Sequence, residues 1–276
     1  MGTRSAPLLC GWRINDMRRY FKIFAVLARY NFIHQTTYRP SFFFAICGKV
    51  LRLILFLAFA DAIFRNVPEI AGWTLERIPF LILTLFVLEF LVGIGFHRNL
   101  LFFLYEQLHD GQYDYILTRP VSTVFLTSFR VIDFFDILPL FGTLTMMAWY
   151  IAVAHTPLLT VFGYAILIGA AYFILFGLAL ILSAINFWTL IQTGVGRLYE
   201  SIGRLNRFPL DVLPKFWRVA LFYVVPVAVA GNIPAKFLIG TWSWWQLLYI
   251  VAFAVAIFIV AVKFWYYALR HYQSVA

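Results

Sequence analysis

The stretch from Leu158 to Ile185 is the feature that most constrains how this chain folds. It is nearly uncharged, and it is longer than the roughly 20 residues that an α-helix needs to cross a bilayer. The whole chain is 63% hydrophobic and only 12% charged, whereas soluble domains carry about 25% charged residues. Lipid is the solvent that accommodates such an excess. The sequence therefore predicts an all-α polytopic membrane protein.

The length suits about five to seven spans, and the hydropathy pattern favours six transmembrane helices. The expected spans are 42–64, 78–96, a span within 121–154, 158–185, a span from near 216, and 246–268. Lys49 and Arg52 lie within the first span, three residues apart and hence on one helix face. We expect both side chains to snorkel to the headgroups. Pro139 is expected to break the third span.

Residues 1–40 contain seven basic residues and a single acid, Asp16. Between Met17 and Phe32 apolar residues fall near helical spacing, which predicts an amphipathic helix in the membrane interface. Pro40 marks its break from the first span. With six spans, most Lys and Arg fall on one side, which the positive-inside rule assigns to the cytoplasm together with both termini. We therefore attribute the net charge of +10 to basic residues that lie near the anionic headgroups of the lipid bilayer, and not to binding of nucleic acid.

Charged residues inside the spans are expensive and therefore informative. Glu89 interrupts the second span, and Arg130, Asp133 and Asp136 share one broad face of the third. An ion pair between Arg130 and Asp133 or Asp136 is one interpretation, and a role in a substrate pathway is the other. For Glu89 the sequence leaves protonation, a partner such as Arg130, and a pathway role all open.

Pro226, Gly231 and Pro234 interrupt the apolar run that precedes the last span. We expect them to break the helix of a re-entrant segment, which is tolerated only where protein buries the freed backbone groups. A simple proline kink is the alternative.

Nothing in the sequence indicates a catalytic or metal site. The two cysteines, Cys10 and Cys47, lack metal-ligand spacing, and no disulfide is expected. The five histidines are too scattered for a metal site, and no serine has companions that would suggest a nucleophile. The phosphate-binding pattern G-x-x-x-x-G-K-[ST] does not occur, so the chain is not expected to hydrolyse ATP itself.

Two motifs are similar to those of the ABC-2 type permease family. GQYDYILTRPVS, residues 111–122, resembles the pattern G-x-L-D-x-x-L-x-R-P. RFPLDVLPKFWR, residues 207–218, followed by VVPVAVAGNIPAKFLIG, residues 224–240, resembles a second, proline-rich signature ending in P-A-x-x-L-x-G. The resemblance covers about the whole chain, and it departs at Tyr113, where an aliphatic residue is expected.

The resemblance implies a half-size permease of an ATP-binding cassette exporter in the bacterial inner membrane. Its partners would be a separate ATP-binding subunit, which holds the ATP and Mg, and a second permease chain; this chain needs no cofactor. A single transmembrane domain, residues 1–276, is expected, divided into 1–40 (tail and interfacial helix), 42–96 (spans 1 and 2), 97–122 (cytoplasmic coupling segment), 123–186 (spans 3 and 4), 187–216 (cytoplasmic loop) and 217–268 (spans 5 and 6).

The segment 97–122, named the connector below, would then couple the permease to the ATPase. In it Glu106, Asp110 and Asp114 recur every four residues, and Gly111 is expected to end a helix or permit a turn. A solvated acidic face without a partner is the alternative. The residues assigned to coupling are Glu106, Asp110, Gly111, Tyr113, Asp114, Arg119 and Pro120.

The substrate stays open among drugs, peptides, lipids and glycans. An intramembrane enzyme acting on a lipid or polyprenyl substrate is the main alternative function, although the acids are few and no metal-binding motif supports it. A channel or secondary transporter would favour an internal repeat, and none is convincing here.

Overall fold

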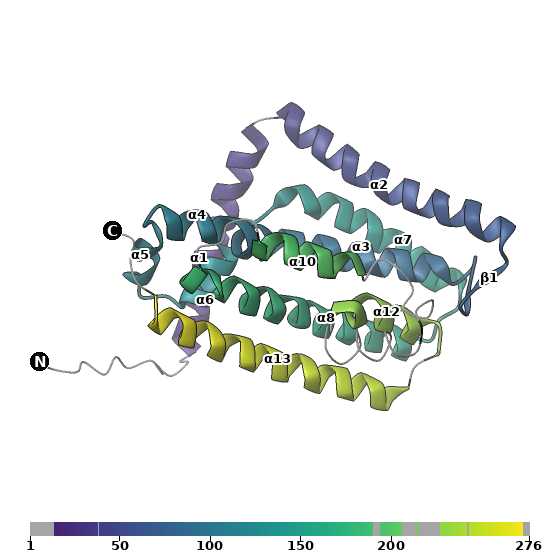
Figure 1. Cartoon of the computed structure of the whole chain (residues 1–276). Helices are drawn as coiled ribbons and strands as arrows, with labels where there is room; N and C mark the ends of the chain where they lie inside the picture. Colours follow the sequence, from purple (N-terminus) through teal and green to yellow (C-terminus); the bar gives the residue numbers. More distant parts are fainter. Residues whose placement is uncertain are drawn as a thin grey trace, which may run out of the picture.

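The fold was analysed in a computed structural model, which describes residues 14–37, 39–189, 194–205, 214, 227–241 and 243–272. The described part is a bundle of long helices with short helices gathered at one end, and it bears out the expected all-α class (Figure 1). The long helices are α2 (Arg39–Asn66), α3 (Ile78–Ile94), α7 (Ile137–Val153), α8 (Leu158–Ala184) and α13 (Trp244–Arg270).

Helix α8 forms the centre of the bundle and packs against α13, α3 and α12 (Val227–Leu238). In its apolar window 61% of the residues are buried inside the chain, compared with 6% for α2. Small residues let α8 approach its neighbours closely, because a Cβ on Gly163 would lie 2.5 Å from a ring carbon of Phe237 in α12. The apolar surface of α2 therefore faces mainly outward, as suits a helix in lipid.

The short elements gather at the end of the bundle that holds the start of α2 and the end of α13 (Figure 1). Helix α1 (Ile14–Thr37) lies across this end, transverse to the long helices, and α2 begins directly after it. The other short elements here are the π-helix η1 (Asn99–Phe103), α4 (Leu104–His109), α5 (Tyr113–Leu117), α6 (Thr123–Phe129), the 3-10 helix η2 (Phe134–Asp136) and α9 (Asn186–Thr189). Helix α10 (Gly194–Leu205) lies along the middle of the bundle and contacts both η1 and α12 (Figure 1).

A two-stranded hairpin closes the opposite end between α2 and α3. Strands β1 (Glu69–Ile70) and β2 (Trp73–Thr74) pair antiparallel, with Ile70 opposite Trp73. Ala71 and Gly72 both have positive φ, as a two-residue type I′ hairpin turn requires. Trp73 is almost fully buried and anchors this hairpin on the bundle.

Within the described residues, four helices are long and apolar enough to cross a membrane by length and composition: Pro40–Asn66, Phe134–Val153, Leu158–Thr189 and Trp244–Arg270. A fifth is obtained when Ile78–Ile94 and Asn99–His109, which meet at a bend of 51°, are taken as one broken span. The remaining expected span starts near residue 216, outside the described residues, so the total of six stays a prediction.

The third span is broken at a different place from the one expected. Residues 130–133 separate α6 from η2 and α7, whereas Pro139 lies inside the first turn of α7. A proline is tolerated there because the first helical N–H groups have no intrahelical acceptor to lose. The prediction of a break at Pro139 was wrong.

The helix before the last span is not broken at Gly231 or Pro234, where the sequence predicted a break. Helix α12 continues through Gly231 and Pro234, and Pro226 lies outside the described residues. The prediction that Gly231 and Pro234 break the helix is therefore corrected, and a re-entrant arrangement stays a prediction.

Candidate functional site

The connector is anchored to the bundle by a row of buried apolar side chains. Leu104 and Leu108 of α4 and Tyr113 of α5 have no exposed surface, and Ile116 is 3% exposed. Gly111 lies between the two helices with a φ of +68°, a left-handed conformation that favours glycine. The predicted turn at Gly111 is therefore present, and it lets both short helices place their apolar residues against the core.

The opposite face of the connector is charged and accessible. Glu106 and Asp110 are exposed, and Asp114 is half-buried. Nδ1 of His109 lies 3.1 Å from Oδ1 of Asp110. Arg119 and Pro120 are exposed where the connector leads into α6. The connector thus offers a firm surface with several acidic side chains at the end of the bundle.

Tyr113, which departs from the family pattern, lies on the inner side of the connector. Its ring meets Phe187 and Tyr272 edge-on, with ring centroids 5.3 and 5.8 Å away, and its hydroxyl oxygen lies 3.4 Å from Oγ1 of Thr127. Burial raises the pKa of the Tyr113 phenol above its usual value of 10, so the ring stays neutral. Tyr113 therefore anchors the connector against the core, which is a role that does not require direct contact with a partner.

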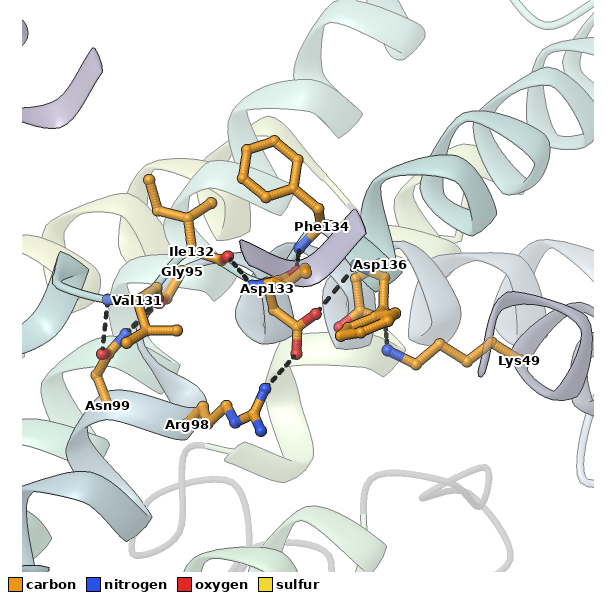
Figure 2. Close-up of polar contacts among 11 residues, drawn as sticks. Lys49, Gly95, Arg98, Asn99, Val131, Ile132, Asp133, Phe134 and Asp136 are labelled. Atoms are coloured by element: carbon orange, nitrogen blue, oxygen red, sulfur yellow. Dashed lines mark hydrogen bonds and ion pairs between the residues drawn. The ribbon is translucent and has the colours of Figure 1, made fainter. Parts of the chain in front are cut away.

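A pocket of about 700 Å³ lies between α2, α3, η2 and α10 and contains three ion pairs. Nζ of Lys49 is 2.5 Å from Oδ1 of Asp136, and a guanidinium nitrogen of Arg52 is 2.5 Å from Oε1 of Glu89. Figure 2 shows the third pair, in which Arg98 lies 3.6 Å from the carboxylate of Asp133. The lining also includes apolar side chains of α3 and α8 (Leu85, Leu88, Val92 and Leu175), residues at the start of the connector (His97, Phe102 and Phe103), and Tyr199 and Glu200 of α10.

These pairs differ from those that the sequence suggested. One interpretation paired Arg130 with either Asp133 or Asp136, but the partner of Asp133 is Arg98 and the partner of Asp136 is Lys49. Arg130 is exposed and forms no ion pair with any residue that the structure describes. The acids and their cations come from different helices, which periodicity along one helix cannot reveal.

The expectation that Lys49 and Arg52 snorkel to the headgroups is also corrected. Both side chains reach sideways from α2 to acids of the bundle. A charge at mid-bilayer costs about 2.5–3.5 kcal/mol on insertion scales, and pairing reduces that cost. The two pairs therefore join α2 to α3 and to η2 at the start of α7.

Three amide side chains that the sequence did not single out hold the break between α6 and α7. Asn99 donates from Nδ2 to the carbonyl of Val131 (2.7 Å) and accepts the Val131 N–H at Oδ1 (3.0 Å), as seen in Figure 2. Gln35 of α1 donates to the carbonyl of Ile132 and accepts the N–H of Phe134, both at 2.8 Å.

The third amide, Asn31 of α1, donates to the carbonyl of Arg130 at 3.0 Å. Asn31, Gln35 and Asn99 are all buried. A buried backbone N–H or carbonyl must find a partner, and a broken helix offers none of its own. The only feature of the sequence that pointed to these residues was the presence of amides in otherwise apolar stretches. It did not indicate which backbone groups they bind.

In the described part of the chain, no three His, Cys, Asp or Glu side chains gather as metal ligands would.

The comparison with protein families matches residues 50–276 to the family described as ABC-2 family transporter protein. No curated protein and no solved structure matches the chain. The match includes most of α2, the connector, the four later long helices α3, α7, α8 and α13, and both signature motifs. The resemblance carried by those motifs is thereby confirmed, and with it the chain's nature as an integral membrane protein. The chain belongs to the ABC-2 family of transporter proteins.

Proposed function

We propose that this chain is the membrane permease of an ATP-binding cassette exporter and is driven by a separate ATP-binding subunit that docks on the connector. Membership of the ABC-2 family implies the permease component of such an exporter. The observation that supports the docking site is the two-sided connector, whose inner residues are fully buried while Glu106 and Asp110 are exposed. A surface that transmits force must be both accessible and firmly attached.

The attachment of the connector leads toward two spans. Asn99 and Arg98, at the start of the connector, bind Val131 and Asp133 in the break before α7. Asp136, at the start of α7, pairs in turn with Lys49 of α2. A rigid-body movement of the connector would therefore reach the entry of α7 and, through Lys49, α2. This continuity favours coupling over a solvated acidic face.

Orientation and assembly follow as parts of the same proposal. The positive-inside rule places the end with α1 and the connector in the cytoplasm of a bacterial cell, with the chain in the inner membrane. The outward-facing apolar surface of α2 is compatible with lipid and with a second permease chain. The three ion pairs support a structural role for Glu89, Asp133 and Asp136, and the class of exported substrate is left open.

Site-specific crosslinking tests the docking proposal. In a chain with Cys10 and Cys47 replaced by Ser, a photoreactive thiol reagent on Asp110→Cys should capture a soluble ATP-hydrolysing subunit in native membranes. The matched control is Glu76→Cys, an exposed acid at the opposite end of the bundle. Capture from position 76 in place of 110, or transport by the chain without any ATP-hydrolysing subunit, would overturn the proposal.

A further inference from the structure

A second, smaller groove lies beside the connector and has a different character from the charged pocket. Its volume is about 470 Å³, and it lies between α1, α5 and α6. Its accessible apolar lining comes from Leu27 of α1 and Tyr115 of α5, and the buried Ile116 of α5 and Leu126 of α6 lie beneath them. Two arginines, Arg119 and Arg130, also line it. The groove thus combines an apolar floor with two positive charges.

The two arginines differ from the cations of the charged pocket because, within the described residues, they form no ion pair. Lys49, Arg52 and Arg98 are each paired with a carboxylate. Arg119 and Arg130 are exposed and take part in no ion pair within the described residues. Their positive charge is therefore available to an anion from outside the chain.

Helix α1 fixes the width of the groove by binding both of its sides. The Tyr20 hydroxyl accepts the N–H of Ser122 at 3.0 Å, just beyond Arg119. Asn31 donates to the carbonyl of Arg130 at 3.0 Å. Leu27 lies between these two contact residues on the same helix. The site is consequently formed before any ligand arrives, which lowers the entropic cost of binding.

The groove lies where a membrane boundary is expected. The candidate span of α2 starts at Pro40, directly after α1, and Arg130 comes shortly before the candidate span that starts at Phe134. Figure 1 shows α1 lying across this end of the bundle. Residues at this level meet lipid headgroups, and the exposed basic residues Arg18, Arg19 and Lys22 of α1 add to the positive charge there.

We propose that this groove binds an anionic phospholipid of the cytoplasmic leaflet, with its phosphate between Arg119 and Arg130 and the start of its acyl chains against the accessible side chains of Leu27 and Tyr115. Guanidinium groups bind phosphate oxygens through paired hydrogen bonds. The apolar floor favours a lipid over free phosphate, which would gain nothing from it. The same floor argues against an acidic protein segment, which would leave apolar surface uncovered. The inference rests on the proposed cytoplasmic orientation and on no assumption about the exported substrate.

Lipid binding by the purified full-length chain tests the proposal. In an uncharged detergent, phosphatidylglycerol and phosphatidylcholine would be titrated separately and bound lipid counted by native mass spectrometry. Phosphatidylglycerol should bind more tightly. Arg119→Gln with Arg130→Gln should reduce its affinity about fivefold per arginine, the value expected for one basic residue at an anionic lipid surface, and leave phosphatidylcholine unchanged.

The matched control is Arg18→Gln with Arg19→Gln, which removes the same charge from exposed positions of α1 that do not line the groove. An equal loss in this control would show a diffuse charge effect and overturn the proposal. Equal binding of the two lipids by the unaltered chain would also overturn it, as would displacement of the lipid by millimolar inorganic phosphate.

Unchanged lipid binding in the Arg119 and Arg130 variant, combined with loss of the ATP-binding subunit, would assign the groove to that protein instead. Should the double variant not fold, Arg119→Gln alone provides the same comparison at an exposed position.

Discussion

Nζ of Lys49 and Oδ1 of Asp136 lie 2.5 Å apart and join α2 to the entry of α7. The pair matters because α2 has little apolar packing with the rest of the chain. Asp136 is only 9% exposed, whereas the Lys49 side chain is 28% exposed and long enough to reach water elsewhere. The two partners therefore depend on the pair to different degrees.

Removing the cation should cost more than removing the acid. Lys49→Met leaves the Asp136 carboxylate buried without a counter-charge and should lower the free energy of unfolding by about 2–3 kcal/mol. Asp136→Asn should cost less, because Lys49 can move toward water. The double variant should recover most of the loss, since the uncompensated charge is gone. Thermal unfolding in detergent measures all three, and a double variant as unstable as Lys49→Met would contradict this account.

A methyl group on Gly93 should disrupt the same pair from the side of α3. A Cβ at this position would overlap the Asp136 carboxylate, so Gly93→Ala must displace Asp136 from Lys49. We expect lower thermal stability for Gly93→Ala, and little further effect when Asp136 is already Ala. Gly142→Ala in α7 is the control, because nothing lies within 4 Å of a Cβ there, and alanine favours a helix by up to about 1 kcal/mol over glycine. Equal destabilisation by both substitutions would rule out the proposed overlap.

The amide of Gln35 should be more important than its place on α1 suggests. Gln35→Leu leaves the carbonyl of Ile132 and the N–H of Phe134 without their partner, and each unsatisfied buried group costs about 1–3 kcal/mol. For the two groups together we therefore expect a loss of about 2–6 kcal/mol in unfolding free energy. Thr36→Val removes only a bond from a side chain to its own helix and should change stability little. A small effect of Gln35→Leu in the same unfolding assay would mean that the break is held by other contacts.

Reversing the acidic charges of the connector should uncouple the transporter without unfolding it. Glu106→Lys with Asp110→Lys changes exposed side chains only, so insertion and thermal stability should be retained. ATP turnover linked to transport should fall at least tenfold if these acids meet cations of the ATP-binding subunit. Glu69→Lys with Glu76→Lys makes the same charge change at the opposite end of the bundle and should leave turnover unchanged. Normal turnover in the connector variant would favour a merely solvated acidic face.

The long helices could be predicted from sequence because hydropathy over 20 residues is a local property. The expected span 42–64 falls inside α2, and the expected span 158–185 nearly coincides with α8. The last expected span, 246–268, falls inside α13. The turn at Gly111 was likewise local, since it depends on the backbone freedom of one residue. Such features need no knowledge of what lies beside them.

The contacts between helices could not be predicted in the same way. Arg130 has the right spacing for Asp133, but the choice of Arg98 as the partner depends on how α3 meets the break before α7. The effect of Pro139 depends on whether it falls in the first turn of a helix or in its interior, and the sequence does not show where α7 begins. The roles of Asn31 and Gln35 could not be predicted, because nothing in the sequence of an amphipathic helix shows which distant backbone groups its amide side chains bind.

The hydrogen bonds from α1 to residues 130–134 also bear on how this chain can be shortened. A version that begins at residue 40 keeps every candidate span of the described residues. By hydropathy alone, such a version would contain all of these membrane-spanning segments. It would nevertheless lose Asn31 and Gln35, and with them the acceptor and donors that satisfy the polar backbone where α7 begins. A membrane domain whose buried backbone groups all have hydrogen-bond partners must therefore include part of α1. It starts before the first apolar segment.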